Sequence, residues 1–131
     1  MKVCSKIVEI RTYGPMVLHP ITYLVKDVIS ECKASMGLVW ISVEGATPAL
    51  IVLSKGMHKD FLNFICRFIP FNGWRHGNAY AHLISTLIST NIVIPIMDGS
   101  LVLSPDDDIY LLETRSVHNH VRRISIQIHT V

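Results

Sequence analysis

The stretch NIVIPIMDGSLVL, residues 91–103, carries the clearest fold signal in the chain. Two short apolar runs, Asn91–Met97 and Ser100–Leu103, lie on either side of Asp98-Gly99. An Asp-Gly pair between two such runs is among the strongest local signals for a two-residue turn between antiparallel strands. This stretch therefore predicts a β-hairpin.

Further strands are predicted on both sides of the hairpin. They share short runs of β-branched and other apolar residues that are bounded by glycine, proline or polar residues. The predicted strands are Val3–Thr12, Leu38–Val43, Ala49–Leu53, Ile109–Glu113 and Arg122–Thr130. About seven strands, with short turns toward the C-terminal end, favour an antiparallel arrangement over a βαβ alternation.

Helical periodicity is present in two segments. After Pro20, apolar residues recur at three- and four-residue steps until Met36-Gly37, and a second apolar face runs from Met57 to Ile69 before Pro70. The run from His76 to Leu87 fits either a helix or a buried strand. Residues 1–131 are thus predicted to form a single domain of the α+β class.

The composition indicates an oligomer and excludes some partners. Half of the residues are hydrophobic and only 17% are charged, so part of the apolar surface is expected to face another subunit. A ring of subunits would also cover edge strands. The net charge of +2 argues for neither nucleic acid nor a membrane as a partner. No apolar run reaches the roughly 18 residues of a membrane span, and no signal-peptide core follows Met1, so a cytoplasmic location is expected.

The three cysteines are Cys4, Cys32 and Cys66. Their odd number and wide spacing fit neither a disulfide framework nor a zinc knuckle, so all three are expected to be reduced. Cys32 and Cys66 fall on the apolar stripes of the predicted helices. They are therefore expected to be small buried thiols rather than nucleophiles.

The polar residues of the His76–Leu87 stretch are the first candidates for a functional site. His76 and His82 lie close in sequence, and the Gly77-Asn78 pair between them suits a turn. A neutral imidazole can bind a metal ion or move a proton at about pH 7. Zinc would require at least one more donor. The alternative is a pair of hydrogen-bonded histidines at a subunit boundary.

Other polar and aromatic clusters have structural explanations. Asp106–Asp108 could hold Mg²⁺ against a diphosphate or could form a turn after Ser-Pro. His118 and His120 are expected in an exposed loop, and Trp40 and Trp74 are expected to fill the core or an interface. The sequence has no P-loop, dinucleotide-binding glycine motif, nucleophile elbow or zinc-protease helix motif, which excludes the chemistries with the best-defined motifs.

Several short motifs follow one another along the chain. They are Gly45-Ala46-Thr47 before a predicted strand, Asp60 in a helix that ends at Pro70, His76-Gly77-Asn78 with His82-Leu83, Pro95 with Asp98-Gly99, and Glu113 followed by Arg122-Arg123. This succession, from about Val3 to Ile128, resembles the YjbQ family. The resemblance implies a homotrimer of antiparallel β-sandwich-like subunits, with two or three helices packed on one side. It also implies a pocket near the subunit interface, lined by histidine and acidic residues.

The resemblance further implies an activity. Members of the family are linked to thiamine phosphate synthesis, in which a pyrimidine diphosphate loses pyrophosphate to the nitrogen of a thiazole phosphate. His82 would carry a proton or bind a metal ion, and Asp60 and Glu113 would orient it. By periodicity alone, Asp60 would instead be a solvated residue. A divalent ion, Mg²⁺ or Zn²⁺, would be held by His82 and His76. The residues implied to bind the phosphorylated substrate are Lys55, His76, Asn78, Thr47 and Arg122.

Three departures from the family pattern leave a second function open. Lys55 takes the place of a usual glutamate, Ser104-Pro105-Asp106-Asp107 replaces a Gly-Thr-Trp-Gln segment, and Ala46 replaces a histidine. The alternative is a non-catalytic trimer that binds a small anion or a metal ion at a degenerate site. Arg122 and Arg123 point to opposite faces of the last strand, so only one of them could reach a pocket.

Overall fold

The hairpin at Asp98-Gly99 is present in the computed structural model, which describes residues 1–131. Asp98 (φ 53°) and Gly99 (φ 76°) both have positive φ angles, as a type I′ turn requires. Met97 pairs with Ser100 across the turn. The predicted hairpin is therefore confirmed, although its second strand has only two residues.

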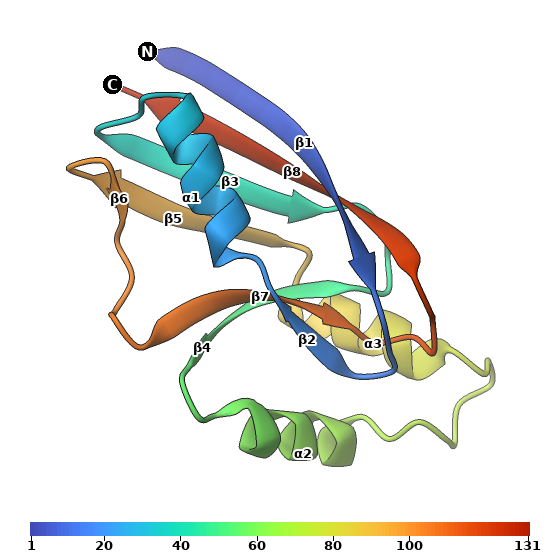
Figure 1. The fold of residues 1–131 in the computed structure, drawn as a ribbon. Coiled ribbons are helices and arrows are strands. Elements are labelled where there is room, and N and C mark those ends of the chain that lie inside the picture. The colour runs from blue at the N-terminus through green and yellow to red at the C-terminus, as the bar shows by residue number, and fades with distance from the viewer.

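Eight strands and three helices make up the chain (Figure 1). The strands are β1 (Lys2–Thr12), β2 (Val17–Pro20), β3 (Gly37–Val43), β4 (Ala49–Ser54), β5 (Asn91–Met97), β6 (Ser100–Leu101), β7 (Asp107–Glu113) and β8 (His120–Thr130). The helices are α1 (Thr22–Glu31), α2 (His58–Phe68) and α3 (Ala79–Ile88), none of which has the length and apolar character to cross a membrane.

The strands form two antiparallel sheets. The larger has the order β1-β8-β3-β5-β6, and the smaller has the order β2-β7-β4. In β8, the side chains of Ile124, Ile126 and Ile128 are fully buried, whereas the residues between them are exposed. Helix α1 lies against this inner face of the larger sheet and adds Val25 and Val28 to the main hydrophobic core (Figure 1). The antiparallel α+β class predicted from the sequence is confirmed.

A second, smaller core holds α2 and α3 against the smaller sheet. Its members are Ala49, Ile65, Ile69, Tyr80, Ala81, Ile84 and Leu112. The apolar side of α3 is thus turned inward, which leaves its other side, with His82, exposed to solvent. The second core therefore sets the orientation of the candidate site.

Two element predictions are resolved by the structure. The ambiguous His76–Leu87 stretch contains α3, which begins at Ala79, so the helical alternative is correct. Pro20 does not open the first helix as predicted. It ends β2, a strand that the sequence analysis missed, and the helix begins at Thr22. Because β2 is an edge strand of the smaller sheet, a proline there can be placed without removing a ladder hydrogen bond.

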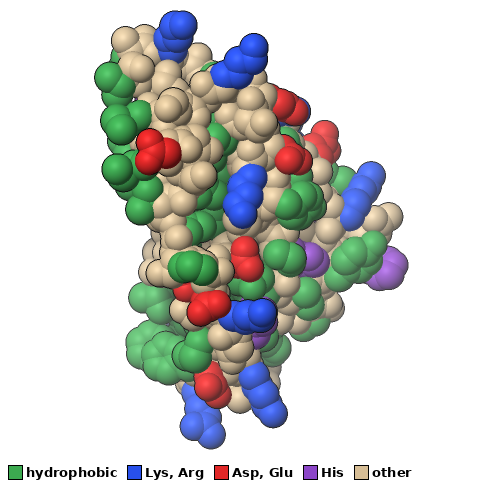
Figure 2. Space-filling model, turned by 60° about the vertical axis from the view of Figure 1, so that its left-hand side comes forward, with side chains coloured by type: hydrophobic (Ala, Val, Ile, Leu, Met, Phe, Trp, Pro, Cys, Tyr) green, Lys and Arg blue, Asp and Glu red, His purple; other side chains and the backbone are tan.

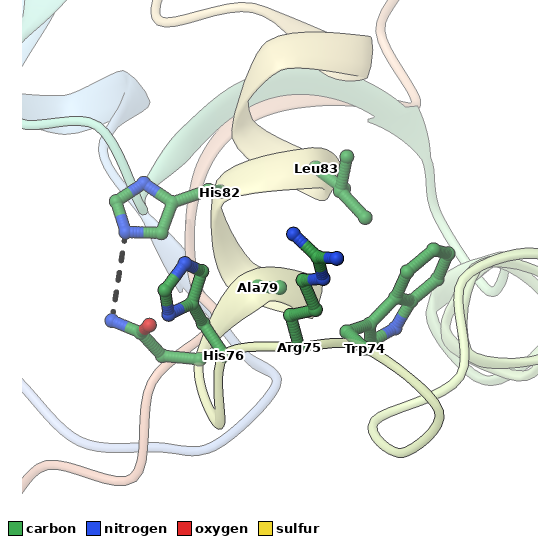
Figure 3. Close-up of a pocket in the computed structure, with 7 residues that line it drawn as sticks. Trp74, Arg75, His76, Ala79, His82 and Leu83 are labelled. Carbon is green, nitrogen blue, oxygen red and sulfur yellow. Dashed lines mark hydrogen bonds between the residues drawn. The ribbon is translucent and has the colours of Figure 1, made fainter.

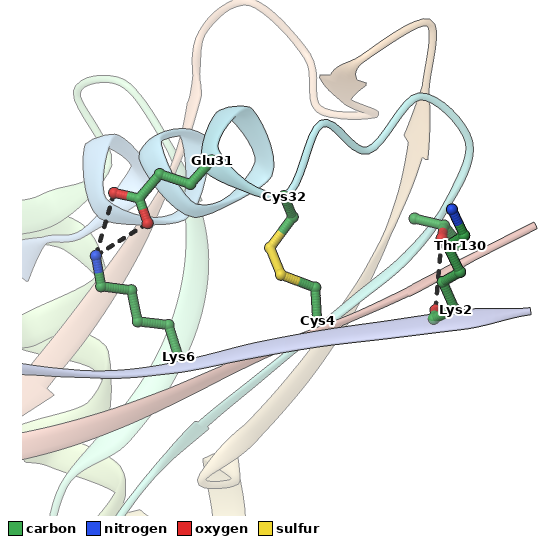
Figure 4. Close-up of a disulfide and its surroundings, with 6 residues drawn as sticks. All are labelled: Lys2, Cys4, Lys6, Glu31, Cys32 and Thr130. Carbon is green, nitrogen blue, oxygen red and sulfur yellow. Dashed lines mark hydrogen bonds and ion pairs between the residues drawn. A yellow bond between two sulfur atoms is a disulfide. The ribbon is translucent and has the colours of Figure 1, made fainter.

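The prediction of three reduced cysteines is wrong. Cys4 and Cys32 form a disulfide that joins β1 to the residue directly after α1 (Figure 4). The two cysteines are 28 residues apart in sequence, and this spacing alone does not predict that β1 passes beside the end of α1. Cys32 is accordingly part-exposed rather than a buried thiol. Cys66 is a half-buried free thiol, and burial raises its pKa, as expected of an unreactive cysteine.

Candidate functional site

The candidate site is an open cavity of about 660 Å³ at the start of α3 (Figure 3). Its wall is formed by the loop that precedes α3 and by the first turns of the helix. The lining residues are Trp74, Arg75, His76, Asn78, Ala79, His82 and Leu83. Ala81 and Ile84 point into the smaller core, so His82 and Leu83 are left on the cavity side.

His76, Asn78 and His82 of the His76–Leu87 stretch line the cavity together. Asn78 Nδ2 lies 3.5 Å from His82 Nε2, one helical turn further on. In Figure 3 the His76 ring lies beside this pair. A contact of 3.5 Å is at the outer limit of a hydrogen bond, so the His82 ring stays available to another group.

Trp74 and Arg75 complete the wall of the cavity. The indole Nε1–H of Trp74 donates to the Pro70 carbonyl at 2.6 Å, which fixes the ring, and 42% of the residue is exposed. Trp40 is 49% exposed, so neither tryptophan lies in the core as one of the predictions had it. Arg75 extends between the indole and the histidines (Figure 3). Arg75 was not predicted from the sequence, although it directly precedes His76, which was the available signal.

The lining has a clear electrostatic preference. It carries one permanent cation, two imidazoles and one amide, and it has no carboxylate. Guanidinium and protonated imidazole groups donate strong, charge-assisted hydrogen bonds to phosphate and carboxylate oxygens. The indole adds a face on which a flat ring can pack. The arrangement is therefore suited to an anion that carries an aromatic ring.

A second polar cluster lies buried between the sheets, around Glu113 and Arg122. The Arg122 Nε and Nη2 groups donate to the two carboxylate oxygens of Glu113, each at 2.8 Å. Thr12 Oγ1 donates to the same carboxylate at 2.7 Å, and Arg122 Nη2 also donates to Thr47 Oγ1 at 3.0 Å. The cluster thereby connects β1, β7 and β8 with the loop before β4.

The protonation of Glu113 follows from these contacts. Burial alone raises the pKa of the carboxyl group, since it disfavours the charged form. The hydrogen bonds from Arg122 and Thr12, together with the Arg122 charge, outweigh burial and lower the pKa below its usual value. Glu113 is therefore ionised at neutral pH, and its lone pairs are occupied within the chain.

One guanidinium nitrogen of Arg122 has no hydrogen-bond partner in the chain. Its Nη1 group makes no hydrogen bond, and it lies next to Gly45, where a Cβ atom would come within 3.1 Å of Nη1. Gly45 has a φ of +124°, a conformation that favours glycine. The absence of a side chain at residue 45 thus leaves room beside the guanidinium. Of the two arginines in β8, Arg122 is the one that points inward, and Arg123 is exposed.

Comparison with known proteins agrees with this fold. The family model described as UPF0047 protein YjbQ-like matches residues 6–130. The chain belongs to the YjbQ-like UPF0047 family. A UPF0047 protein of Archaeoglobus fulgidus is 32% identical over 97 residues, which cover 68% of this chain and 77% of that protein. A UPF0047 protein of Methanocaldococcus jannaschii is 30% identical over 112 residues and 80% of each chain.

Solved structures of UPF0047 proteins have the same fold. A "YbjQ-like protein of unknown function" from Sulfolobus solfataricus P2 superposes with a TM-score of 0.91 at 26% identity, over 99% of both chains. An uncharacterised UPF0047 protein of Clostridium acetobutylicum gives a TM-score of 0.88 at 23% identity, over 95% of this chain and 99% of its own. The resemblance found in the sequence is therefore confirmed for the family and the fold.

The remaining site residues implied by the UPF0047 resemblance lie apart from the cavity. Lys55 follows β4, and Asp60 is exposed in the first turn of α2. Neither lines the cavity at α3. Lys55 N–H donates to the Asp106 carbonyl at 2.7 Å. Two of the three departures from the UPF0047 pattern, at Lys55 and at Ser104–Asp107, are therefore adjacent in space.

The metal candidates are also placed by the structure. No three His, Cys, Asp or Glu side chains are grouped closely enough to hold an ion. Asp107 accepts a hydrogen bond from Ser54 Oγ at 2.7 Å, and Asp108 accepts one from Thr22 Oγ1 at 2.8 Å. These two aspartates thus have structural contacts. His118 is exposed and packs edge-on against Tyr13, as expected for a loop residue.

Proposed function

We propose that this UPF0047 protein binds a small phosphorylated molecule with a flat ring in the cavity at the start of α3. Arg75, His76 and His82 hold the phosphate oxygens, Asn78 adds an amide donor, and the ring packs on Trp74. The observation that carries this proposal is the composition of the lining: a guanidinium, two imidazoles and an indole around one open cavity without a carboxylate.

The charge of Arg75 is available to a ligand. The ion pairs of the chain are Lys6–Glu31, Arg122–Glu113 and Arg123–Glu44, so Arg75 has no acidic partner. The cavity volume of about 660 Å³ falls within the range of about 300–1,000 Å³ that is typical of small-molecule sites. A phosphate group placed there would gain charge-assisted hydrogen bonds without displacing an internal ion pair.

A second candidate is the synthesis of thiamine phosphate at the same site. The observation that favours it is an exposed imidazole, His82, in the same cavity as the permanent cation Arg75. The thiazole nitrogen would bond to the pyrimidine substituent carbon while the bond from that carbon to the diphosphate oxygen breaks. Pyrophosphate would leave with the electron pair, stabilised by Arg75 and His76, and His82 would give it a proton. A divalent ion at His76 and His82 would need a ligand from outside this set.

We also propose that the protein is a homotrimer. The support is the outer face of the larger sheet, which no helix covers. It exposes several large apolar side chains: Val3, Ile7, Leu38, Trp40, Val93 and Met97. Figure 2 shows hydrophobic side chains gathered along the left-hand edge of the molecule. Exposed apolar patches of this kind mark protein interfaces.

Calorimetric titration tests the binding proposal. The purified protein is titrated with thiamine phosphate, inorganic pyrophosphate and thiamine. The two phosphorylated compounds are expected to bind, and thiamine is expected to bind at least about tenfold more weakly. Arg75→Ala and His82→Ala should each weaken phosphate binding about tenfold, whereas His129→Ala, at the far end of β8, should not. Lack of binding by both phosphorylated compounds would rule the proposal out.

Incubation with the pyrimidine diphosphate and the thiazole phosphate separates the two candidates. Formation of thiamine phosphate that is lost in His82→Ala, with the oligomer unchanged, supports the enzyme. Binding without product supports the non-catalytic protein. Native mass spectrometry of the same samples reports the oligomer and any bound metal ion.

A further inference from the structure

The N-terminal half of β1 has little apolar contact with the rest of the protein. None of residues 1–7 belongs to either hydrophobic core. Lys2, Cys4 and Lys6 share the inward face of β1 with Val8 and Ile10, and only the latter two pack against the main core. The neighbouring inward residues of β8, Ile126 and Ile128, are fully buried. The beginning of an edge strand thus covers the core with cysteine and lysine side chains.

The Cys4–Cys32 disulfide is the strongest tie of this half-strand to anything but β8. It connects β1 with the residue that follows α1 (Figure 4). Directly beside it, Lys6 Nζ and Glu31 Oε2 form an ion pair at 3.0 Å, with 48% and 56% of the two side chains exposed. Exposed ion pairs contribute little to stability, because water and salt screen them. The covalent bond therefore takes the place of the missing hydrophobic contact.

We propose that the Cys4–Cys32 disulfide is a redox-operated clasp that holds residues 2–7 of β1 against β8 and α1. Both cysteines are part-exposed, so a small or protein dithiol can reach them. A thiolate of that dithiol attacks one sulfur, the cystine bond breaks, and the second thiol of the dithiol releases the mixed disulfide. Two electrons and two protons pass to Cys4 and Cys32, and the dithiol becomes a disulfide.

Reduction then releases the half-strand. Within one chain, residues 2–7 then keep only the ladder to β8, the hydrogen bond from Thr130 Oγ1 to the Lys2 carbonyl and the exposed Lys6–Glu31 pair, so they separate from β8 far more often. Each separation exposes the backbone N–H and C=O groups at the edge of β8, next to Ile126 and Ile128. Another strand can then pair with this edge. The fold beyond Val8 stays intact, since its inward residues belong to the main core. This inference is independent of the ligand proposed for the α3 cavity.

Hydrogen exchange with mass spectrometry tests the clasp on the full chain. In the oxidised protein, peptides that cover residues 2–7 are expected to be protected. With dithiothreitol, or in Cys4→Ser/Cys32→Ser without it, their exchange should rise about tenfold or more, while peptides of α3 stay unchanged. Cys66→Ser serves as the matched cysteine control and should respond to dithiothreitol as the natural chain does. Lys6→Ala should keep its protection while oxidised.

Three results would overturn the clasp. One is a reduced protein whose residues 2–7 stay as protected as in the oxidised form. Another is an equal rise in exchange across all peptides, α3 included, because that indicates general destabilisation rather than a local release. The third is a titration of three free thiols in protein that has been equilibrated with oxidised glutathione.

Discussion

Arg122 and Glu113 form a bidentate ion pair between the sheets, with two N···O distances of 2.8 Å. The pair connects β8 of the larger sheet with β7 of the smaller. A buried charge lowers stability unless it is paired and its hydrogen-bonding groups have partners. The Glu113 carboxylate accepts hydrogen bonds from Arg122, from Thr12 and from the Arg115 backbone N–H. The pair therefore favours one relative placement of the two sheets.

Glu113→Gln is expected to destabilise the fold by about 3 kcal/mol, because it leaves the Arg122 charge buried without its counter-ion. The free energy of unfolding in urea measures this loss. Glu44→Gln is the matched control: Glu44 pairs with Arg123 at 3.5 Å on the surface, so its removal should cost less than about 1 kcal/mol. Equal losses in the two variants would contradict a special role for the buried pair.

The same carboxylate makes the stability depend on acidity. The pKa of Glu113 is lower in the folded protein than in the unfolded chain, so the unfolded chain takes up the proton more readily as the pH falls. The contribution is complete above the usual carboxyl value of about 4.5 and is lost progressively as the pH falls toward the folded pKa. The free energy of unfolding is measured for the natural chain and for Glu113→Gln at several values from about pH 7 to about pH 3. The difference between the two proteins should become smaller as the pH falls. Parallel curves would contradict the lowered pKa.

Local patterns in the sequence account for much of the fold. Asp98-Gly99 allows few alternatives to a tight hairpin, and alternate burial of Ile124, Ile126 and Ile128 follows directly from strand periodicity. Pro20 is ambiguous by the same local rules, since proline suits both a first helical turn and an edge strand. The pairing of β2 with β7, which decides the case, joins distant parts of the chain.

Only some of the polar clusters could be predicted, because others depend on such long-range placement. His76, Asn78 and His82 are close in sequence, so their meeting at one cavity could be predicted. Thr47, Glu113 and Arg122 meet only because β7 and β8 pack beside the loop before β4. The Cys4–Cys32 bond is hidden for the same reason, because cysteine spacing carries no information on which elements lie side by side.

The outer face of the larger sheet is expected to be the contact between subunits. Trp40→Arg and Val93→Arg place a charge in the middle of its exposed apolar side chains, and a buried charge without a partner is strongly unfavourable. Sedimentation should show monomers for these variants and trimers for the natural chain, with unchanged circular dichroism. Tyr23→Arg, on the exposed side of α1, is the control that should remain trimeric. A natural chain that sediments as a monomer would refute the contact.

Restoring the usual family residues at Lys55 and Asp106 tests whether these positions decide between catalysis and binding. The backbone bond from Lys55 to Asp106 places them side by side, so Lys55→Glu/Asp106→Trp changes one region of the surface while keeping that bond. If the natural chain is a binder, thiamine phosphate should form from the two precursors only with the double variant, measured by chromatography of the reaction mixture. Lys59→Glu, which makes the same charge change on α2, should remain inactive. Product from the natural chain at the rate of the double variant would show that the two departures do not matter for the reaction. Product from neither form would exclude this reaction and leave ligand binding at the α3 cavity as the function to be tested.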